Sequence, residues 1–143
     1  MRNSVLFIML ALLSSPLWAS DTGSPRMNYM LHCSGCHGQD ATGSPGAGVP
    51  SMRGAIGHFF KVEGGRQFLI QVPGTSQSSL NDAQTAELMN WMLKTFSKDE
   101  IPAATPPYTR QEVAQLRASP LVEVAAEREA IIKRLQAQGI AID

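Results

Sequence analysis

This chain has few of the features that mark the commonest functional classes. Its 143 residues carry 12 basic and 12 acidic side chains, so neither sign of charge dominates. Aromatic residues make up only 6% of the sequence, and no basic tract with interleaved aromatics occurs. This composition excludes nucleic acid as an expected partner. Its one unbroken apolar run of note, Val5–Leu13, is too short to cross a bilayer.

Cysteine is scarce, since Cys33 and Cys36 are the only two in the chain. A zinc ribbon would need a second cysteine pair or two histidines at ligand spacing, and His32, His37 and His58 do not provide that spacing. A thioredoxin-like redox pair would lie near a βαβ pattern, which is not evident here. A structural disulfide is the simplest alternative, but it leaves the adjacent histidine without a role.

The two cysteines lie in the segment Cys33-Ser34-Gly35-Cys36-His37. This is a C-x-x-C-H motif, the spacing at which a c-type haem is attached. Two thiols three positions apart on one helical turn can each add to a haem vinyl group, and the next residue can ligate the iron. The motif therefore predicts one covalently attached haem c, with Cys33 and Cys36 as attachment sites and His37 as an axial iron ligand.

The N-terminus has the pattern of a secretory signal peptide. Met1-Arg2-Asn3 is a short positive start, the apolar run of nine residues follows, and Ser14–Ala19 ends in a small residue. We expect cleavage after Ala19, so that residues 1–19 are the signal peptide and the mature chain is periplasmic. An uncleaved membrane anchor is the alternative.

Two helices are predicted around the central part of the chain, over 25–38 and over 81–97. Asn81 can cap the second helix, with Gln84 as its reciprocal partner in a capping box. Between the two helices only Phe68–Val72 suggests a short extended piece, so the expected fold class is all-α. The second helix carries a buried stripe at helical spacing, formed by Leu88, Trp91, Met92 and Leu93.

A Pro-rich linker over 101–108 leads to a helical tail. Thr109-Arg110-Gln111-Glu112 has the pattern of a capping box and predicts a short helix that runs to about residue 118. Ser119-Pro120 then predicts the start of an amphipathic helix over 120–138, which Gly139 ends. We expect the residues of this helix to divide into an inward set (Val124, Ile131 and Leu135) and an outward set (Glu127, Arg128 and Lys133).

Residues 25–97 resemble a single class I cytochrome c domain. Tyr29 lies four residues before the first cysteine, where such domains place an aromatic residue. Val49-Pro50-Ser51-Met52-Arg53-Gly54 is similar to the Pro-x-Leu-x-Gly segment of the family, and Trp91 matches its C-terminal aromatic. The resemblance implies a small helical domain around haem over 20–100, with Tyr29 and Trp91 in contact, and it leaves 101–143 as a C-terminal helical extension.

The resemblance also implies which residues orient the axial histidine and which contact the haem propionates. Pro50 matches the proline whose carbonyl accepts a hydrogen bond from the ligand imidazole, here His37, which would fix its tautomer. His58 lies in the segment where related domains place a polar contact to a haem propionate, so we expect it there. Arg53 and Arg66 are alternative propionate partners, since both are fixed cations.

The sixth iron ligand is where this sequence departs from the family. Class I domains usually place a Met-Pro dipeptide before the C-terminal helix, but here Val72-Pro73 occupies that stretch. Met52 takes the place of the family leucine on the His37 side, and Met89 and Met92 lie on the second helix. The sixth ligand is therefore unknown. Two alternatives stay open: an open or weakly ligated distal site near Val72, Thr75 or Ser76, or closure by His58 or a rearranged methionine.

The expected function is that of a periplasmic one-electron carrier. No acid–base pair or partnered nucleophile can be identified, which argues against an enzyme. We expect a periplasmic dehydrogenase as donor, an oxidase or another cytochrome as acceptor, and contact with membranes only through such partners. The alternative is a ligand-binding or peroxidase-like haem protein. The extension could dock a redox partner or wrap back over the haem domain, and the donor, acceptor, reduction potential and oligomeric state are not encoded in any motif.

Overall fold

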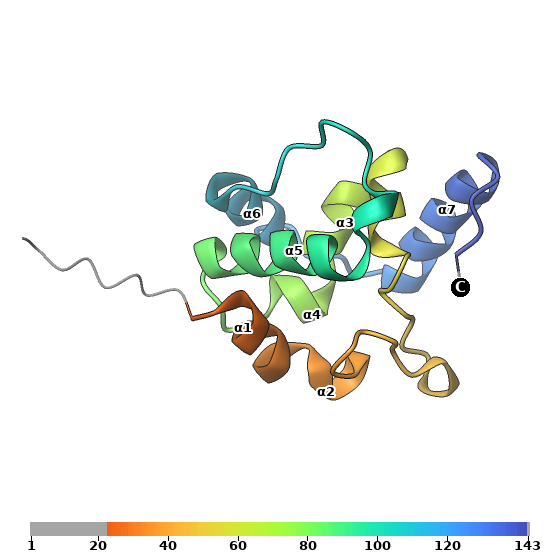
Figure 1. The fold of residues 1–143 in the computed structure, drawn as a ribbon. Helices are drawn as coiled ribbons and strands as arrows, with labels where there is room; N and C mark the ends of the chain where they lie inside the picture. The colour runs from red at the N-terminus through yellow and green to blue at the C-terminus, as the bar shows by residue number, and fades with distance from the viewer. Residues whose placement is uncertain (1–22, 143) are drawn as a thin grey trace, which may run out of the picture.

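The computed structural model describes residues 23–142, and within that range it contains helices but no β-strand (Figure 1). A single bridge joins Ser44 and Val49, so the all-α fold class is confirmed. The predicted signal peptide, residues 1–19, lies outside the described residues. Among the described helices, none is both long enough and apolar enough to span a membrane. The elements are α1 (Pro25–His32), α2 (Ser34–His37), η1 (Pro45–Ala47), η2 (Ile56–Lys61), α3 (Gly65–Gln71), α4 (Pro73–Ser76), α5 (Asp82–Phe96), η3 (Lys98–Glu100), α6 (Arg110–Arg117) and α7 (Val124–Gln136).

The helix predicted over 25–38 is divided into α1 and α2 at Cys33, whose backbone angles are φ −124° and ψ −38°. The Ser34 hydroxyl donates to the Met30 carbonyl at 2.8 Å. Such a back-bond from serine to the preceding turn often bends a helix. The break separates α1 from the short helix α2, which carries the second cysteine and the histidine of the motif.

Helix α5 begins as the sequence predicts. Gln84 donates its backbone N–H to Asn81 Oδ1 at 2.9 Å, and Asn81 donates its own to Gln84 Oε1 at 3.0 Å. This reciprocal pair is a capping box, which satisfies two N–H groups that the first turn leaves unpaired. The predicted buried stripe is confirmed for Leu88, Met92 and Leu93, which are each no more than 5% exposed, whereas Trp91 is only partly buried.

Tyr29 anchors the motif segment on α5. Its ring is fully buried, 5.7 Å from the Trp91 ring and 5.1 Å from the Phe96 ring between centroids. The predicted meeting of Tyr29 and Trp91 is therefore confirmed. The Tyr29 hydroxyl also donates to the Gly38 carbonyl at 2.6 Å. One side chain thus ties the end of α2 to the crossing of α1 and α5.

The expectation of an extended piece at Phe68–Val72 is wrong, because Gly65–Gln71 form helix α3. A short apolar run does not reveal by periodicity whether it is a strand or a buried helix. Here Gly65 packs directly against the backbone of Phe59, so that a Cβ at this position would overlap the Phe59 carbonyl. This close approach lets α3 bury Phe68, Leu69 and Ile70.

The C-terminal tail packs back on the rest of the chain (Figure 1). Helix α6 contacts α5 and α3, and α7 contacts η2 and α3. Three apolar side chains of these two helices are fully buried in the shared core: Val113, Ile131 and Leu135. The tail is therefore held by apolar packing of the kind that stabilises a domain interior.

The predicted start of the last helix at Pro120 is wrong, since α7 begins at Val124. Leu121 donates its backbone N–H to the Gln71 carbonyl at 2.9 Å, and Gln71 Nε2 donates to the Ser119 carbonyl at 3.0 Å. These two hydrogen bonds attach Ser119 and Leu121 to Gln71 at the end of α3, so the last helix begins only after this segment. One half of the predicted capping box of α6 is confirmed, because Thr109 Oγ1 accepts from the Glu112 backbone N–H at 3.2 Å. The Glu112 carboxylate pairs with the Arg66 guanidinium at 2.7 Å.

Candidate cofactor cavity

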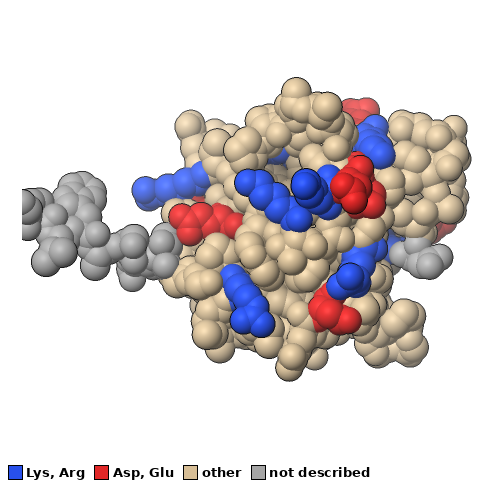
Figure 2. Space-filling model, viewed as in Figure 1, with Lys and Arg blue, Asp and Glu red and all other residues tan. Residues whose placement is uncertain are grey.

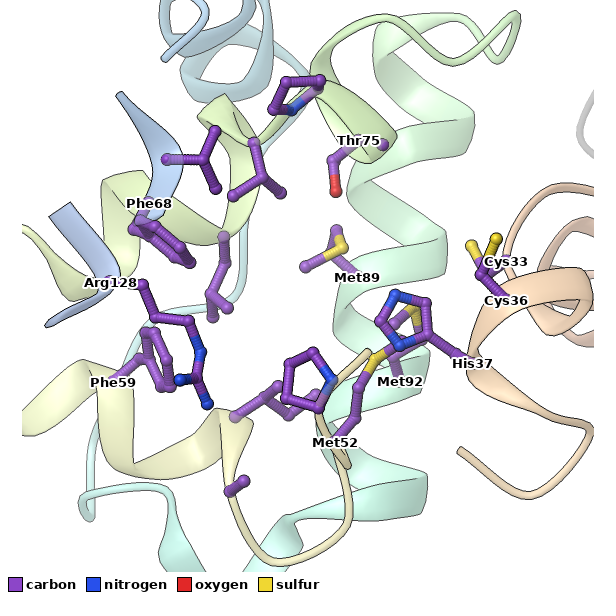
Figure 3. Close-up of a pocket in the computed structure, with 18 of the residues that line it drawn as sticks. Cys33, Cys36, His37, Met52, Phe59, Phe68, Thr75, Met89, Met92 and Arg128 are labelled. Atoms are coloured by element: carbon purple, nitrogen blue, oxygen red, sulfur yellow. The ribbon is translucent and has the colours of Figure 1, made fainter. Parts of the chain in front are cut away.

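A cavity of about 820 Å³ opens between the motif helices, α5, the α3–α4 segment and α7 (Figure 3). This volume lies within the range of about 300–1,000 Å³ that is typical of small-molecule and cofactor sites. The walls are mostly apolar, and they include buried residues from distant parts of the sequence: Met52, Ile56, Phe59, Phe68, Leu69, Leu88, Met89 and Met92.

The three chemically distinctive residues of the C-x-x-C-H motif all line this cavity. Figure 3 shows Cys33, Cys36 and His37 on the same wall. Both cysteines are free thiols, so they do not form a disulfide. Cys33 is half-buried, and this burial raises the pKa of its thiol to about 11. The thiol is therefore protonated at neutral pH.

His37 points its imidazole into the cavity (Figure 3). Its Nδ1 is buried and makes no hydrogen bond of good geometry. Burial lowers the pKa of His37, while the nearby Pro50 carbonyl acts in the opposite direction. The imidazole is therefore neutral at pH 7, the form in which a histidine binds a metal. A neutral imidazole on the wall of a mostly apolar cavity fits a metal-bearing cofactor, with one ring nitrogen available to the metal and the other to the Pro50 carbonyl.

Three buried methionines contribute sulfur to the cavity walls. In Figure 3 Met52 and Met92 lie near His37, and Met89 lies farther along α5 toward Thr75. The position of Met52 agrees with the expectation that it packs on the His37 side, and Met92 is a core residue that is 4% exposed.

The segment that replaces the expected Met-Pro dipeptide forms another part of the wall. Val72 and Thr75 line the cavity, as predicted, and Figure 3 shows the Thr75 hydroxyl pointing into it. Ser76 does not belong to the wall. Ser78, which sequence reasoning missed, does, and its Oγ is buried without a hydrogen-bond partner.

The residues predicted to contact a haem propionate lie elsewhere. His58 is not part of the cavity wall, and its Nδ1 lies 3.0 Å from Lys61 Nζ. Partial burial, followed by the Lys61 charge, lowers the pKa of His58, and Glu100 opposes this shift. The alternatives are also outside the wall, since Arg53 donates to the Asp40 carbonyl and Arg66 is engaged by the tail. A propionate contact for these three residues stays a prediction.

The arginine that does line the cavity is Arg128 of α7 (Figure 3). The expectation that its side chain points outward is wrong. Val124 and Ile132 line the cavity as well, four positions before and after it. Residues at this spacing share one face of a helix. The four-residue spacing could therefore have placed Arg128 on the same helix face as Val124 and Ile132. That this face lines the cavity follows only from the position of α7 in the fold.

Comparison with known proteins gives two curated relatives, both named cytochrome c-552. The first, from Thermus thermophilus, is 31% identical over 117 residues, an alignment that covers 68% of this chain and 88% of the relative. The second, from a particular strain of the same species, has the same identity and the same share of this chain, with 78% of the relative covered. No family model matches the sequence.

Proposed function

The chain belongs to the c-type cytochromes, electron-transfer proteins that carry covalently attached haem c, and on this premise we propose that it is an exported mono-haem carrier of the class I type. The observation that carries the proposal is the C-x-x-C-H motif on the wall of a mostly apolar cavity of about 820 Å³. When bound, the haem supplies one-electron chemistry at its iron. The protein supplies attachment, orientation and the electrostatic environment.

We assign the attachment to the motif residues. Cys33 and Cys36 hold the haem through thioether bonds, and His37 is its axial iron ligand. The Pro50 carbonyl orients the His37 ring, since both residues line the same cavity and Pro50 already influences the pKa of His37. A hydrogen bond from the second ring nitrogen of a ligating histidine fixes the tautomer and increases its basicity.

Arg128 is the proposed cationic partner of a haem carboxylate. It lies on the cavity wall, which His58, Arg53 and Arg66 do not. A guanidinium can donate two parallel hydrogen bonds to a carboxylate. The propionate contact that the sequence suggests for His58 stays a separate prediction.

We propose that 20–100 form the haem domain and that the extension, 101–143, completes its cavity rather than serving only as a docking module. Support comes from α7, which provides Val124, Arg128 and Ile132 to the wall. Further support comes from the fully buried Val113 of α6.

The proposed location is the periplasm, on the basis of the sequence pattern in residues 1–19. We propose a periplasmic dehydrogenase as electron donor and an oxidase or another cytochrome as acceptor. Basic and acidic side chains are interspersed on the face shown in Figure 2. This distribution favours short-lived contacts over a strongly charged docking patch.

The test is to express the whole chain with the export and haem-attachment machinery of a bacterial periplasm. We expect the mature protein to lack residues 1–19, to gain the mass of one haem that survives denaturation, and to titrate reversibly with one electron. Cys33→Ser and Cys36→Ser should each lose one thioether bond, while Ser79→Ala, an exposed change outside the cavity wall, should retain both. A wild-type chain that gains no haem contradicts the proposal.

A further inference from the structure

We propose that the turn over 72–78 forms an open distal site, where a small π-accepting diatomic ligand binds ferrous iron next to the hydroxyls of Thr75 and Ser78. This inference rests on the proposed haem function and adds a ligand class to it. Carbon monoxide and nitric oxide have the required chemistry, since each binds ferrous haem and can accept a hydrogen bond.

The turn offers no strong iron ligand of its own. Its cavity-lining residues are Val72, Pro73, Gly74, Thr75 and Ser78. None of them has a thioether, thiolate or imidazole, the groups that serve as strong axial haem ligands. By the resemblance to class I domains, this is the stretch that would otherwise bring the methionine sulfur to the iron.

The same turn presents hydroxyl groups to the cavity. Thr75 points its hydroxyl into the open space (Figure 3). Ser78 Oγ is buried and has no hydrogen-bond partner. Burial of an unpaired hydroxyl is unfavourable, so such a group marks a place where a ligand or water would be bound. Two donors in one short turn match a ligand that accepts hydrogen bonds.

Arg117 of α6 holds this turn in place. Its guanidinium donates to the carbonyls of Ser76 at 3.0 Å, Ser78 at 2.8 Å and Leu80 at 2.8 Å. It also pairs with Asp82 at 2.9 Å. The contacts to Ser76 and Ser78 lie in the turn, and those to Leu80 and Asp82 lie just after it, so Arg117 holds both the turn and the segment that follows it in position.

Met89 is the residue that could close the site. Met52 and Met92 lie near His37 in Figure 3, whereas Met89 lies farther along α5 toward Thr75. Met89 is 4% exposed and is packed in the core. We assign it to the side wall of the cavity, where its sulfur packs against the cofactor, and the experiment below includes a variant that tests this assignment.

The experiment is a carbon monoxide titration of the reduced, haem-loaded full chain, with the optical spectrum and the C–O stretching frequency as readouts. We expect a rapid spectral shift in the wild type. Thr75→Val and Ser78→Ala should each weaken binding about two- to tenfold, the effect of losing one net hydrogen bond, and should raise the stretching frequency. Thr95→Val and Ser79→Ala are matched controls, because both residues are exposed and outside the cavity wall, and we expect wild-type binding for them.

Each contrary outcome identifies what fails. A chain without haem contradicts the proposed function itself. A haem-loaded wild type that does not respond to carbon monoxide overturns only the distal inference, and if Met89→Leu then gains binding, Met89 is the sixth ligand. Carbon monoxide binding that is the same in Thr75→Val, Ser78→Ala and the controls overturns the assignment of the hydroxyls.

Discussion

The Tyr108 hydroxyl donates to the backbone carbonyl of Arg66 at 2.6 Å, while the Arg66 guanidinium lies 4.2 Å from the centroid of the Tyr108 ring. The guanidinium is held in turn by Glu112 at 2.7 Å and by the Pro106 carbonyl at 2.8 Å. Tyr108 is 3% exposed, and its burial raises the pKa of its hydroxyl far above the usual value. The segment 101–108, which the sequence indicates as a linker, is thus part of the packed structure.

Removal of the Tyr108 hydroxyl should weaken the fold. Tyr108→Phe keeps the ring over Arg66 but leaves the Arg66 carbonyl without this donor. We expect the free energy of unfolding to fall by about 1 kcal/mol, as measured by urea denaturation. An unchanged denaturation midpoint would show that the hydrogen bond adds nothing to stability.

Removal of the extension should be far more damaging. A chain that ends at Pro102 loses the buried side chains of Tyr108, Val113, Ile131 and Leu135. Because these residues share one core with α3 and α5, we expect loss of cooperative thermal unfolding by circular dichroism. Unchanged melting together with slower electron acceptance would instead favour a docking role for the extension.

Gly43 is a position where the backbone requires glycine. Its φ is +71°, and a Cβ there would lie 2.5 Å from the Pro50 carbonyl oxygen. Its N–H also donates to the His37 carbonyl at 2.8 Å. Gly43→Ala should therefore reduce stability by about 1–3 kcal/mol. Gly46→Ala is the matched control, because its added Cβ meets no atom within 4 Å. Equal denaturation midpoints for the two variants would contradict this account.

Arg128 should raise the reduction potential of the bound haem. A nearby cation favours the reduced iron, which carries one positive charge fewer. Arg128→Gln should therefore lower the potential by an amount on the order of tens of millivolts. Arg110→Gln is the control, since Arg110 is exposed and outside the cavity wall. A spectroelectrochemical titration that gives the same potential for both variants would exclude an electrostatic role for Arg128.

His58 should make stability depend on pH. Its pKa is lowered in the folded chain by burial and by Lys61, so below the ordinary histidine pKa of about 6.5 the unfolded chain binds the proton more readily. The contribution of His58 is thus present above that pH and is lost as the pH falls. We expect His58→Gln to lose less stability than the wild type between about pH 7 and pH 5 in urea titrations. A parallel pH profile for the two proteins would contradict this expectation.

Several local features could be predicted from the sequence because they depend on near neighbours. The capping box of Asn81 and Gln84 joins residues three positions apart. The three functional residues of the C-x-x-C-H motif share one wall because they lie within five consecutive residues, little more than one helical turn. The contact of Tyr29 with Trp91 was expected from the family resemblance, which already contains tertiary information.

The sequence by itself determined the motif, the helical class and the cap positions, because hydrogen bonds over three or four residues are set by local order. Only the tertiary structure decided that Phe68 is helical, that α7 begins at Val124 and that Arg128 faces the cavity. Those outcomes depend on contacts between distant segments, such as the bond from Leu121 to Gln71. The free energy of such contacts comes from packing and burial, which local periodicity does not encode.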